Sequence, residues 1–258
     1  IENSVGQSSL LPYLGLEDPF NITIGELPII IHDELESETG WTIGDFNDNA
    51  TTGIWEFGNP NGVYIQSQGL YSQPENDYSI NGENCFVTGN STGNGEGFDD
   101  VDGGITTLIS PMYSLDNADE IIFNFALWYS NNLGDNPSSD GFIVEYREDL
   151  ELGWLYFYST NMSTLGWELR NFYLSDYIDD FEQIQFKFIA SDLYYEGDNE
   201  SGGSLVEAAL DELKFLALYA NYLLGDANLD GNIDVTDVIS IVNFILGNVI
   251  PDETMINN

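Results

Sequence analysis

The sequence predicts an all-β protein, a two-sheet antiparallel jelly-roll sandwich followed by a small C-terminal EF-hand-like calcium loop and helix. Three observations support this class. Segments rich in aromatic and β-branched residues recur from about residue 28 to 218, with apolar side chains at every second position. Clusters of Gly, Asn, Asp and Ser separate these segments. A clear helical spacing of apolar residues comes only near the C-terminus. About ten strands at this spacing are typical of a sandwich.

The same pattern divides the chain into four parts. Residues 1–27 are polar without a clean period, and we expect them to form an arm or a linker. The sandwich is expected over 28–219, and it opens at a proline, which the first position of a strand tolerates. The calcium loop and helix are expected over 220–250, and 251–258 form a tail.

Three segments show the strand alternation most clearly. In the first, the alternate apolar residues are Ile121, Phe123, Phe125, Leu127 and Tyr129. In the second, Phe142, Val144 and Tyr146 alternate with Ile143, Glu145 and Arg147. In the third, Ile184, Phe186 and Phe188 alternate with Gln183, Gln185 and Lys187. Because successive side chains of a strand point to opposite faces, the third segment is predicted to have one buried and one solvated face.

Residues 226–237 fit a twelve-residue calcium loop. Oxygen ligands fall mostly at alternate positions, and Gly231 stands at the sixth position, where the chain must turn sharply. The predicted Ca²⁺ ligands are Asp226, Asn228, Asp230, the backbone carbonyl of Asn232, Asp234 directly or through water, and Asp237. The alternative is an Asp/Asn-rich turn that binds nothing, but the spacing, the glycine and the following helix favour calcium.

Apolar residues after the loop recur at helical spacing, which predicts a helix. They are Val238, Ile239, Val242, Ile245 and Leu246. Asp234 can cap the first turn, Gly247 is placed for a left-handed stop, and Pro251 prevents continuation. The apolar face of so short a helix has to pack on the preceding domain, on a partner or on another copy of the chain.

The stretch Gly225–Gly247, which joins this loop to one helix, resembles a single repeat of a type I dockerin. That family uses Asp at the twelfth loop position, where this chain has Asp237, and a dockerin normally carries two repeats. The resemblance implies calcium binding. One repeat does not by itself imply the docking of a dockerin to a cohesin.

The charge balance restricts the partners. The chain has 45 acidic residues against four basic ones, and its formal net charge is −41. Such a chain repels the phosphates of nucleic acids and anionic membrane surfaces, and it favours multivalent cations. No apolar run approaches the length of a membrane span. We therefore expect an extracellular or cell-surface protein that has no nucleic-acid partner.

The single cysteine and the single histidine exclude several classes of site. Cys85 alone cannot form an internal disulfide or a Cys-based metal cluster, and it is predicted to be a buried structural thiol. His32 alone excludes a multi-histidine metal site and leaves little room for a Ser-His-Asp triad. A structural role is predicted for His32.

The Gly-rich stretch Gly89–Gly104 is the candidate for a second metal site. Its glycines expose backbone carbonyls, and nothing basic lies near it in the sequence to meet a phosphate. The candidate ligands are Asp99, Asp100 and Asp102, with Asp140, Glu207 and Asp211 brought close by the sandwich. A solvated acidic loop is the alternative. Buried carboxylates at Glu207 and Asp211 would cost on the order of several kcal/mol each unless paired or metal-bound, which favours a metal or a backbone-rich loop nearby.

Trp154, Tyr156 and Tyr158 are predicted to share one face of a strand. An exposed row of this kind can stack on sugar rings, whereas a buried row forms half of the sandwich core, and the core is the commoner arrangement. Tyr194, in a predicted loop, is the better candidate for an exposed contact.

Residues 34–216 contain, in order, sequence blocks that resemble the MAM-like jelly-roll modules appended to secreted bacterial peptidases and large surface proteins. The blocks are Trp41–Asp45, Asp48–Trp55, Cys85–Gly89, Asp100–Pro111, Trp128–Asn131, Phe188–Asp192 and Ser204–Asp211. The resemblance implies a secreted accessory module without a catalytic centre. It implies no particular ligand, because a fold does not determine function.

Three functions remain. The preferred one is a non-catalytic, calcium-binding module for recognition or adhesion, with a carbohydrate or protein ligand at the cell surface. The second is a structural subunit of an extracellular filament or surface assembly, whose partner is another copy of the chain. The third is a calcium-dependent carbohydrate-active enzyme or an accessory domain of a secreted peptidase. No nucleophile elbow, zinc helix or cofactor loop appears in the sequence to favour catalysis.

Overall fold

The computed structural model describes most of the predicted sandwich and part of the C-terminal segment. The described residues are 27–91, 97–115, 118–179, 181–193, 203–218, 225–227 and 232–245. One compact unit, Pro28–Tyr219, contains the strands of these residues. The helix α1 (Val235–Ile245) belongs to a separate unit.

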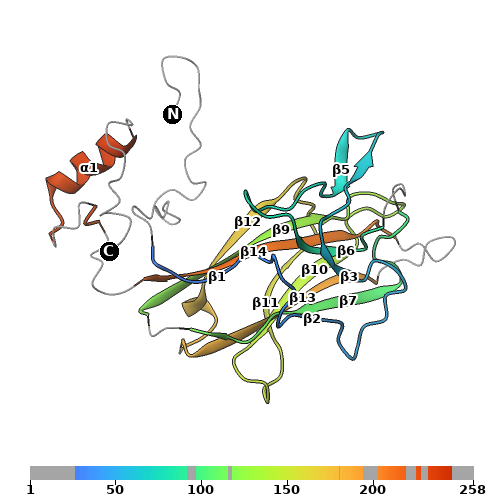
Figure 1. Cartoon of the computed structure of the whole chain (residues 1–258), viewed down its shortest axis with the longest axis horizontal. Helices are drawn as coiled ribbons and strands as arrows, with labels where there is room; N and C mark the ends of the chain where they lie inside the picture. The colour runs from blue at the N-terminus through green and yellow to red at the C-terminus, as the bar shows by residue number, and fades with distance from the viewer. Residues whose placement is uncertain are drawn as a thin grey trace. The chain divides into compact units, whose positions relative to one another are not determined.

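The described strands form two six-stranded antiparallel sheets and one hairpin (Figure 1). The first sheet has the order β12 (Glu168–Tyr173), β9 (Glu120–Ser130), β14 (Glu207–Leu218), β6 (Cys85–Thr88) and β3 (Trp55–Gly58), and β1 (Ile29–Asp33) also pairs with β14. The second has the order β11 (Leu155–Thr160), β10 (Gly141–Arg147), β13 (Gln183–Asp192), β7 (Gly104–Ile109) and β2 (Thr42–Ile43), and β8 (Tyr113–Ser114) pairs with β13. The hairpin is β4 (Val63–Ile65) with β5 (Leu70–Gln73), and η2 (Leu174–Asp176) is a short 3₁₀ helix.

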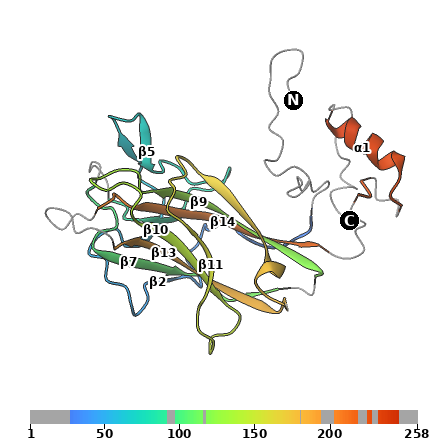
Figure 2. The ribbon, with the colours of Figure 1, turned by 180° about the vertical axis from the view of Figure 1, so that it is seen from behind.

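Eight of these strands wind as a jelly roll (Figures 1 and 2). The order β6–β14–β9–β12 in one sheet faces the order β7–β13–β10–β11 in the other. From β6 onward the chain crosses between the sheets after β6, β8, β9, β11, β12 and β13. This is the connectivity of a double-sheet jelly roll. The predicted antiparallel sandwich is confirmed.

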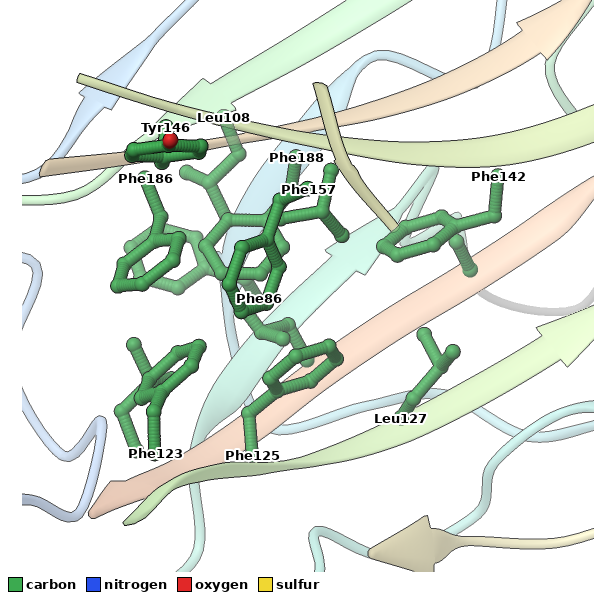
Figure 3. Packing of buried hydrophobic residues seen from close by; sticks show 14 of the residues in the cluster. Phe86, Leu108, Phe123, Phe125, Leu127, Phe142, Tyr146, Phe157, Phe186 and Phe188 are labelled. Atoms are coloured by element: carbon green, nitrogen blue, oxygen red, sulfur yellow. The ribbon is translucent and has the colours of Figure 1, made fainter. Parts of the chain in front are cut away.

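Aromatic side chains fill the space between the two sheets (Figure 3). Phe123 of β9 stacks on Phe186 of β13, with ring centroids 4.1 Å apart and planes 9° from parallel. Phe125 meets Phe188 edge to face at 5.4 Å. These contacts confirm the alternation predicted for β9, and the burial of every second residue confirms it for β10.

The solvated face predicted for β13 is wrong, because the structure buries it as well. Gln185 and Lys187 are each only 8% exposed. Arg147 Nε donates a hydrogen bond of 2.8 Å to Gln185 Oε1, and the ring of Trp154 lies 4.8 Å from Lys187 Nζ. A side chain from a neighbouring strand thus covers polar groups that the alternation alone would expose to water.

Cys85 and His32 both lie in the first sheet. Cys85 is a buried free thiol at the start of β6, as predicted, and burial raises its pKa well above the usual value. His32 of β1 lies between two carboxylates, with Nδ1 3.7 Å from Glu34 and Nε2 3.8 Å from Glu212.

The helix α1 begins at a reciprocal cap. The backbone N–H of Thr236 donates to Oδ1 of Asp234 at 2.7 Å, and the N–H of Asp234 donates to Oδ2 of Asp237 at 2.7 Å. This is the geometry of a capping box, with Asp in place of the usual Glu, and it confirms the cap predicted at Asp234. Leu246, Gly247 and Pro251 lie outside the described residues. No helix in the described part of the chain is long and apolar enough to cross a membrane.

Candidate functional site

Carboxylates gather at one end of the sandwich, three of them buried and two half-buried, and we call Asp99, Asp100, Asp102, Asp192 and Glu207 the acidic cluster. Asp100 and Asp102 precede β7, Asp192 ends β13 and Glu207 begins β14. Asp100 is 1% exposed, Asp192 3% and Glu207 4%. The cluster therefore draws on both sheets, and strand pairing places its members together.

Backbone hydrogen bonds hold the segment that carries Asp100 and Asp102 against the rest of the sandwich. The N–H of Val101 donates to the carbonyl of Val206 at 2.9 Å, and Thr52 Oγ1 donates to the carbonyl of Asp100 at 2.9 Å. Gly53 makes this approach possible. Its φ is +63°, and a Cβ there would overlap the backbone nitrogen of Val101.

Four carboxylate oxygens of the acidic cluster are buried without a hydrogen-bond partner among the described residues. They are both oxygens of Asp100, Oδ1 of Asp102 and Oδ1 of Asp192. The second oxygen of Asp192 accepts a 3.1 Å hydrogen bond from the N–H of Gly103. A buried carboxylate without partners loses its hydration and gains nothing in return, so it must be neutralised by a proton or a cation.

The pKa values of the cluster are raised, mainly by burial. Burial and then the charge of Asp102 raise the pKa of Asp100 to about 7. Burial also raises the pKa of Asp192 to about 7, with the charge of Asp140 adding to the rise and the Gly103 N–H opposing it. The pKa of Glu207 lies well above its usual value because of burial and the charges of Asp100 and Asp99. The surroundings of these carboxyl groups thus disfavour their ionised form near neutral pH.

Asp140 lies beside the cluster, but its oxygens are already engaged. Oδ1 accepts from the N–H of Leu193 at 2.8 Å, and Oδ2 accepts from the hydroxyls of Ser204 at 2.6 Å and Ser139 at 3.1 Å. Its charge raises the pKa of Asp192. Of the predicted ligands, Asp140 is therefore placed to support the cluster.

Asp211 is not brought into the cluster. It shares the outer face of β14 with Glu207, but the two are four residues apart, about 13 Å along a strand. Its Oδ2 accepts from the N–H groups of Tyr78 at 2.8 Å and Ser79 at 3.1 Å. Burial raises the pKa of Asp211 to about 7.

Asp192 was not among the predicted ligands, although its position offered a signal. It is the last residue of the strongly apolar strand β13, so its carboxylate is held at the end of a buried strand. Among the described residues, no three His, Cys, Asp or Glu side chains form a metal-holding group. A cation at the cluster would therefore complete its shell with backbone carbonyls and water, which calcium accepts.

The predicted loop 226–237 is described only in part. Asn228, Asp230 and Gly231 lie outside the described residues. Asp226 and Asp237 are buried, and Asp234 and Asp237 form the cap of α1. Calcium binding by this loop stays a prediction.

The predicted aromatic row is split between two faces. A β-bulge interrupts the pairing of β10 with β11 between Val144 and Glu145. Tyr158 pairs with Val144 and packs on Phe172 of the other sheet at 5.3 Å, whereas Trp154 and Tyr156 lie on the outer face. The core interpretation is thus wrong for Trp154 and Tyr156. Tyr194 lies outside the described residues.

We call Trp154 and Tyr156 the outer platform. The ring of Trp154 contacts two cations. Arg147 Cζ lies 4.3 Å and Lys187 Nζ 4.8 Å from its centroid. Tyr156 lies opposite Glu145 and is 65% exposed. The platform is an aromatic surface with charged groups beside and beneath it.

Comparisons with known proteins find limited likeness. No family model and no curated protein match the chain. Among solved structures, the K1 cleaved adhesin domain of Lys-gingipain from Porphyromonas gingivalis W83 is 15% identical, with 72% of this chain and 97% of that chain covered and a TM-score of 0.41. The CBM22-1 xylan-binding domain of Xyn10C from Paenibacillus barcinonensis is 12% identical, with 78% and 99% covered and a TM-score of 0.37.

A third structure contains the CBM22-1 and GH10 modules of an endo-1,4-β-D-xylanase from Clostridium thermocellum, complexed with xylohexaose. It is 12% identical, with 75% of this chain and 29% of that chain covered and a TM-score of 0.38. A TM-score below 0.5 does not establish a shared fold family, so these likenesses identify neither a relative nor a ligand.

Proposed function

We propose that this chain is a non-catalytic, extracellular β-sandwich module that is stabilised by calcium and recognises a carbohydrate or a protein. The observation that carries the calcium part is the set of four buried, partnerless carboxylate oxygens in the acidic cluster. The formal net charge of −41 raises the local concentration of cations around the whole molecule.

Calcium fits the cluster better than other common metals do. The donors are oxygens, and the cluster contains no imidazole or thiol, which zinc and copper prefer. Calcium accepts six to eight oxygens in a flexible geometry, so one or two carboxylates of the cluster can bind an ion whose shell is completed by carbonyls and water. The loop 226–237 would hold a further calcium ion.

The hollow beside β2 and β6 does not present the side chains of a typical glycosidase. This hollow, of about 500 Å³, is lined by Glu38, Thr39, Trp41, Ile43 and Phe86. Glu38 is the one carboxylate in that lining, whereas most glycosidases need two carboxyl groups that flank the scissile bond. A binding function would explain the exposed aromatic residues of the outer platform without requiring a catalytic centre.

A structural subunit of an extracellular assembly is the second candidate, and α1 favours it. Val238 is 56% exposed and Ile239 is 53% exposed on this short helix. An exposed apolar helix face is available for contact with another copy of the chain. Sedimentation of the whole chain in calcium separates the two candidates, because only the assembly subunit forms large species.

Thermal melting of the whole chain, in calcium and in excess chelator, tests the calcium part. Calcium should raise the melting temperature of the wild type, and Asp100→Asn should remove most of that rise. Glu151→Gln, an exposed carboxylate of the β10–β11 turn, is the matched control and should behave as the wild type. Equal melting temperatures of the wild type in calcium and chelator would refute calcium stabilisation.

A further inference from the structure

We propose that the outer platform, Trp154 and Tyr156, binds an uncharged polysaccharide by stacking against its sugar rings. This inference rests on the proposed recognition function and gives that function a site and a ligand class. Trp154 directly precedes β11 and Tyr156 is its second residue, so the two residues are close enough along the chain to contact one glycan chain.

The first argument is that two cations restrain the ring of Trp154. Arg147 Cζ and Lys187 Nζ lie 4.3 and 4.8 Å from its centroid, and each cation is itself held in place. Lys187 Nζ is 2.6 Å from Glu145, and Arg147 Nε donates to Gln185 at 2.8 Å. Cation–π contact with two restrained groups limits the movement of the indole. A ring that is already immobilised loses little conformational entropy when a ligand binds.

The second argument is the exposure of Tyr156. It is 65% exposed although it stands on a strand of a well-packed sandwich. Its hydroxyl lies 3.1 Å from Ser159 Oγ, so one end of the ring is anchored while its face is open. Aromatic residues that are held in this way supply contact area at low entropic cost.

The chemistry around the platform indicates a sugar. A pyranose ring presents C–H groups on its faces and hydroxyls around its rim, so it needs both an aromatic surface and nearby hydrogen-bonding groups. The platform supplies both, because Glu145 and Asp45 lie beside Lys187 at 2.6 and 3.6 Å. Their carboxylates can accept hydrogen bonds from hydroxyl groups at the edge of the rings.

Charge selects an uncharged glycan over an acidic one. The net charge of −41 repels a polyanion from the whole surface. The two cations at the platform do not offset this repulsion. Lys187 is 8% exposed and already paired with Glu145, and Arg147 adds only one positive charge. An extended peptide could pair with the backbone of the edge strand β11, but that mode of binding does not require the two aromatic rings of the platform.

Affinity electrophoresis of the whole chain, in calcium, tests the platform. The native gels contain arabinoxylan, galactomannan or hydroxyethyl cellulose as neutral probes, or polygalacturonate as an acidic probe. At least one neutral polysaccharide should retard the wild type. Tyr156→Ala should weaken that binding about tenfold or more, Tyr156→Phe should retain most of it, and the melting temperature of both variants should equal that of the wild type.

Tyr64→Ala is the matched control, because Tyr64 is 51% exposed on the separate β4–β5 hairpin. It should bind as the wild type does. The proposal is overturned if no neutral probe retards the wild type, if Tyr156→Ala binds as tightly as the wild type, or if polygalacturonate alone is bound. A ligand that pairs with the backbone of the edge strand β11, as an extended peptide does, would bind Tyr156→Ala as tightly as the wild type. That result would also overturn the proposal. The calcium-dependent melting shift is a separate measurement, so its failure would refute the proposed function independently.

Discussion

The backbone N–H of Gly103 donates a 3.1 Å hydrogen bond to Oδ2 of Asp192, and Oδ1 of the same carboxylate is buried without a partner among the described residues. The bond joins the end of β13 to the segment that precedes β7. This hydrogen bond fixes the carboxylate in position, so the proposed calcium ion would meet an oxygen that is already oriented. Preorganisation of this kind raises affinity because binding orders little that was mobile.

Asp192→Asn should change stability in opposite directions with and without calcium. In chelator it removes a buried negative charge and should raise the melting temperature. In calcium it removes a charged ligand, so the affinity for calcium should fall about tenfold or more. Calcium titration followed by melting measures both effects.

Asp140→Asn is the comparison for that variant. The oxygens of Asp140 accept hydrogen bonds from Leu193, Ser204 and Ser139, so loss of the charge should lower stability in both conditions. If Asp192→Asn behaved as Asp140→Asn does, the carboxylate of Asp192 would be a structural hydrogen-bond acceptor and not a calcium ligand.

Without divalent cations, the protein should lose stability as the pH rises. The pKa values of Asp100 and Asp192 are about 7 in the folded state and near 4 in an unfolded chain. Between these values the folded state binds more protons, so the free energy of unfolding falls as pH increases, and it levels off above the folded pKa. In chelator, unfolding by urea should show a stability at pH 7.5 at least about 1 kcal/mol below that at pH 5.5.

Calcium should weaken or reverse this pH dependence, because a bound cation favours the ionised carboxylates. Asp100→Asn should also flatten the profile measured in chelator. An unchanged steep profile in Asp100→Asn would show that other groups, such as Asp211, determine the pH dependence.

Gly53→Ala should destabilise the sandwich strongly. Gly53 has a φ of +63°, and the added Cβ would overlap the backbone of Val101. Backbone must move to relieve this overlap, so we expect a loss of about 3 kcal/mol or more in the free energy of unfolding. Gly153→Ala is the control, because no atom lies within 4 Å of a Cβ at that position, and its stability should stay near that of the wild type.

Asp230→Ala should reduce the calcium bound per chain by one ion. Asp230 is the fifth position of the loop 226–237, where a missing carboxylate removes a direct ligand. Equilibrium dialysis of the whole chain measures the number of ions, and the melting temperature of 28–219 should hardly change. Asp252→Ala, outside the loop, should leave the number unaltered. An equal calcium content in both variants would show that the loop binds no calcium.

The local sequence pattern was sufficient to predict burial where the alternation along a single strand decides which side chains face the core. The alternation of apolar residues in β9 and β10 predicted which side chains enter the core, because successive residues of a strand point to opposite faces. The cap at Asp234 was predictable for a similar reason. A side-chain oxygen reaches the N–H two residues along the chain, so the interaction is local.

The residues alone were thus enough to predict the sandwich, the burial of Cys85 and the presence of Asp100, Asp102 and Glu207 in an acidic region. They did not show that Asp192 joins this region or that Asp211 lies beside Tyr78 and Ser79 instead. Nor did they show that Trp154 lies against Lys187 or that a bulge separates Tyr158 from Tyr156. These relationships depend on how segments far apart in the sequence pair and pack, and strand register with its bulges is not encoded in the spacing along any one segment.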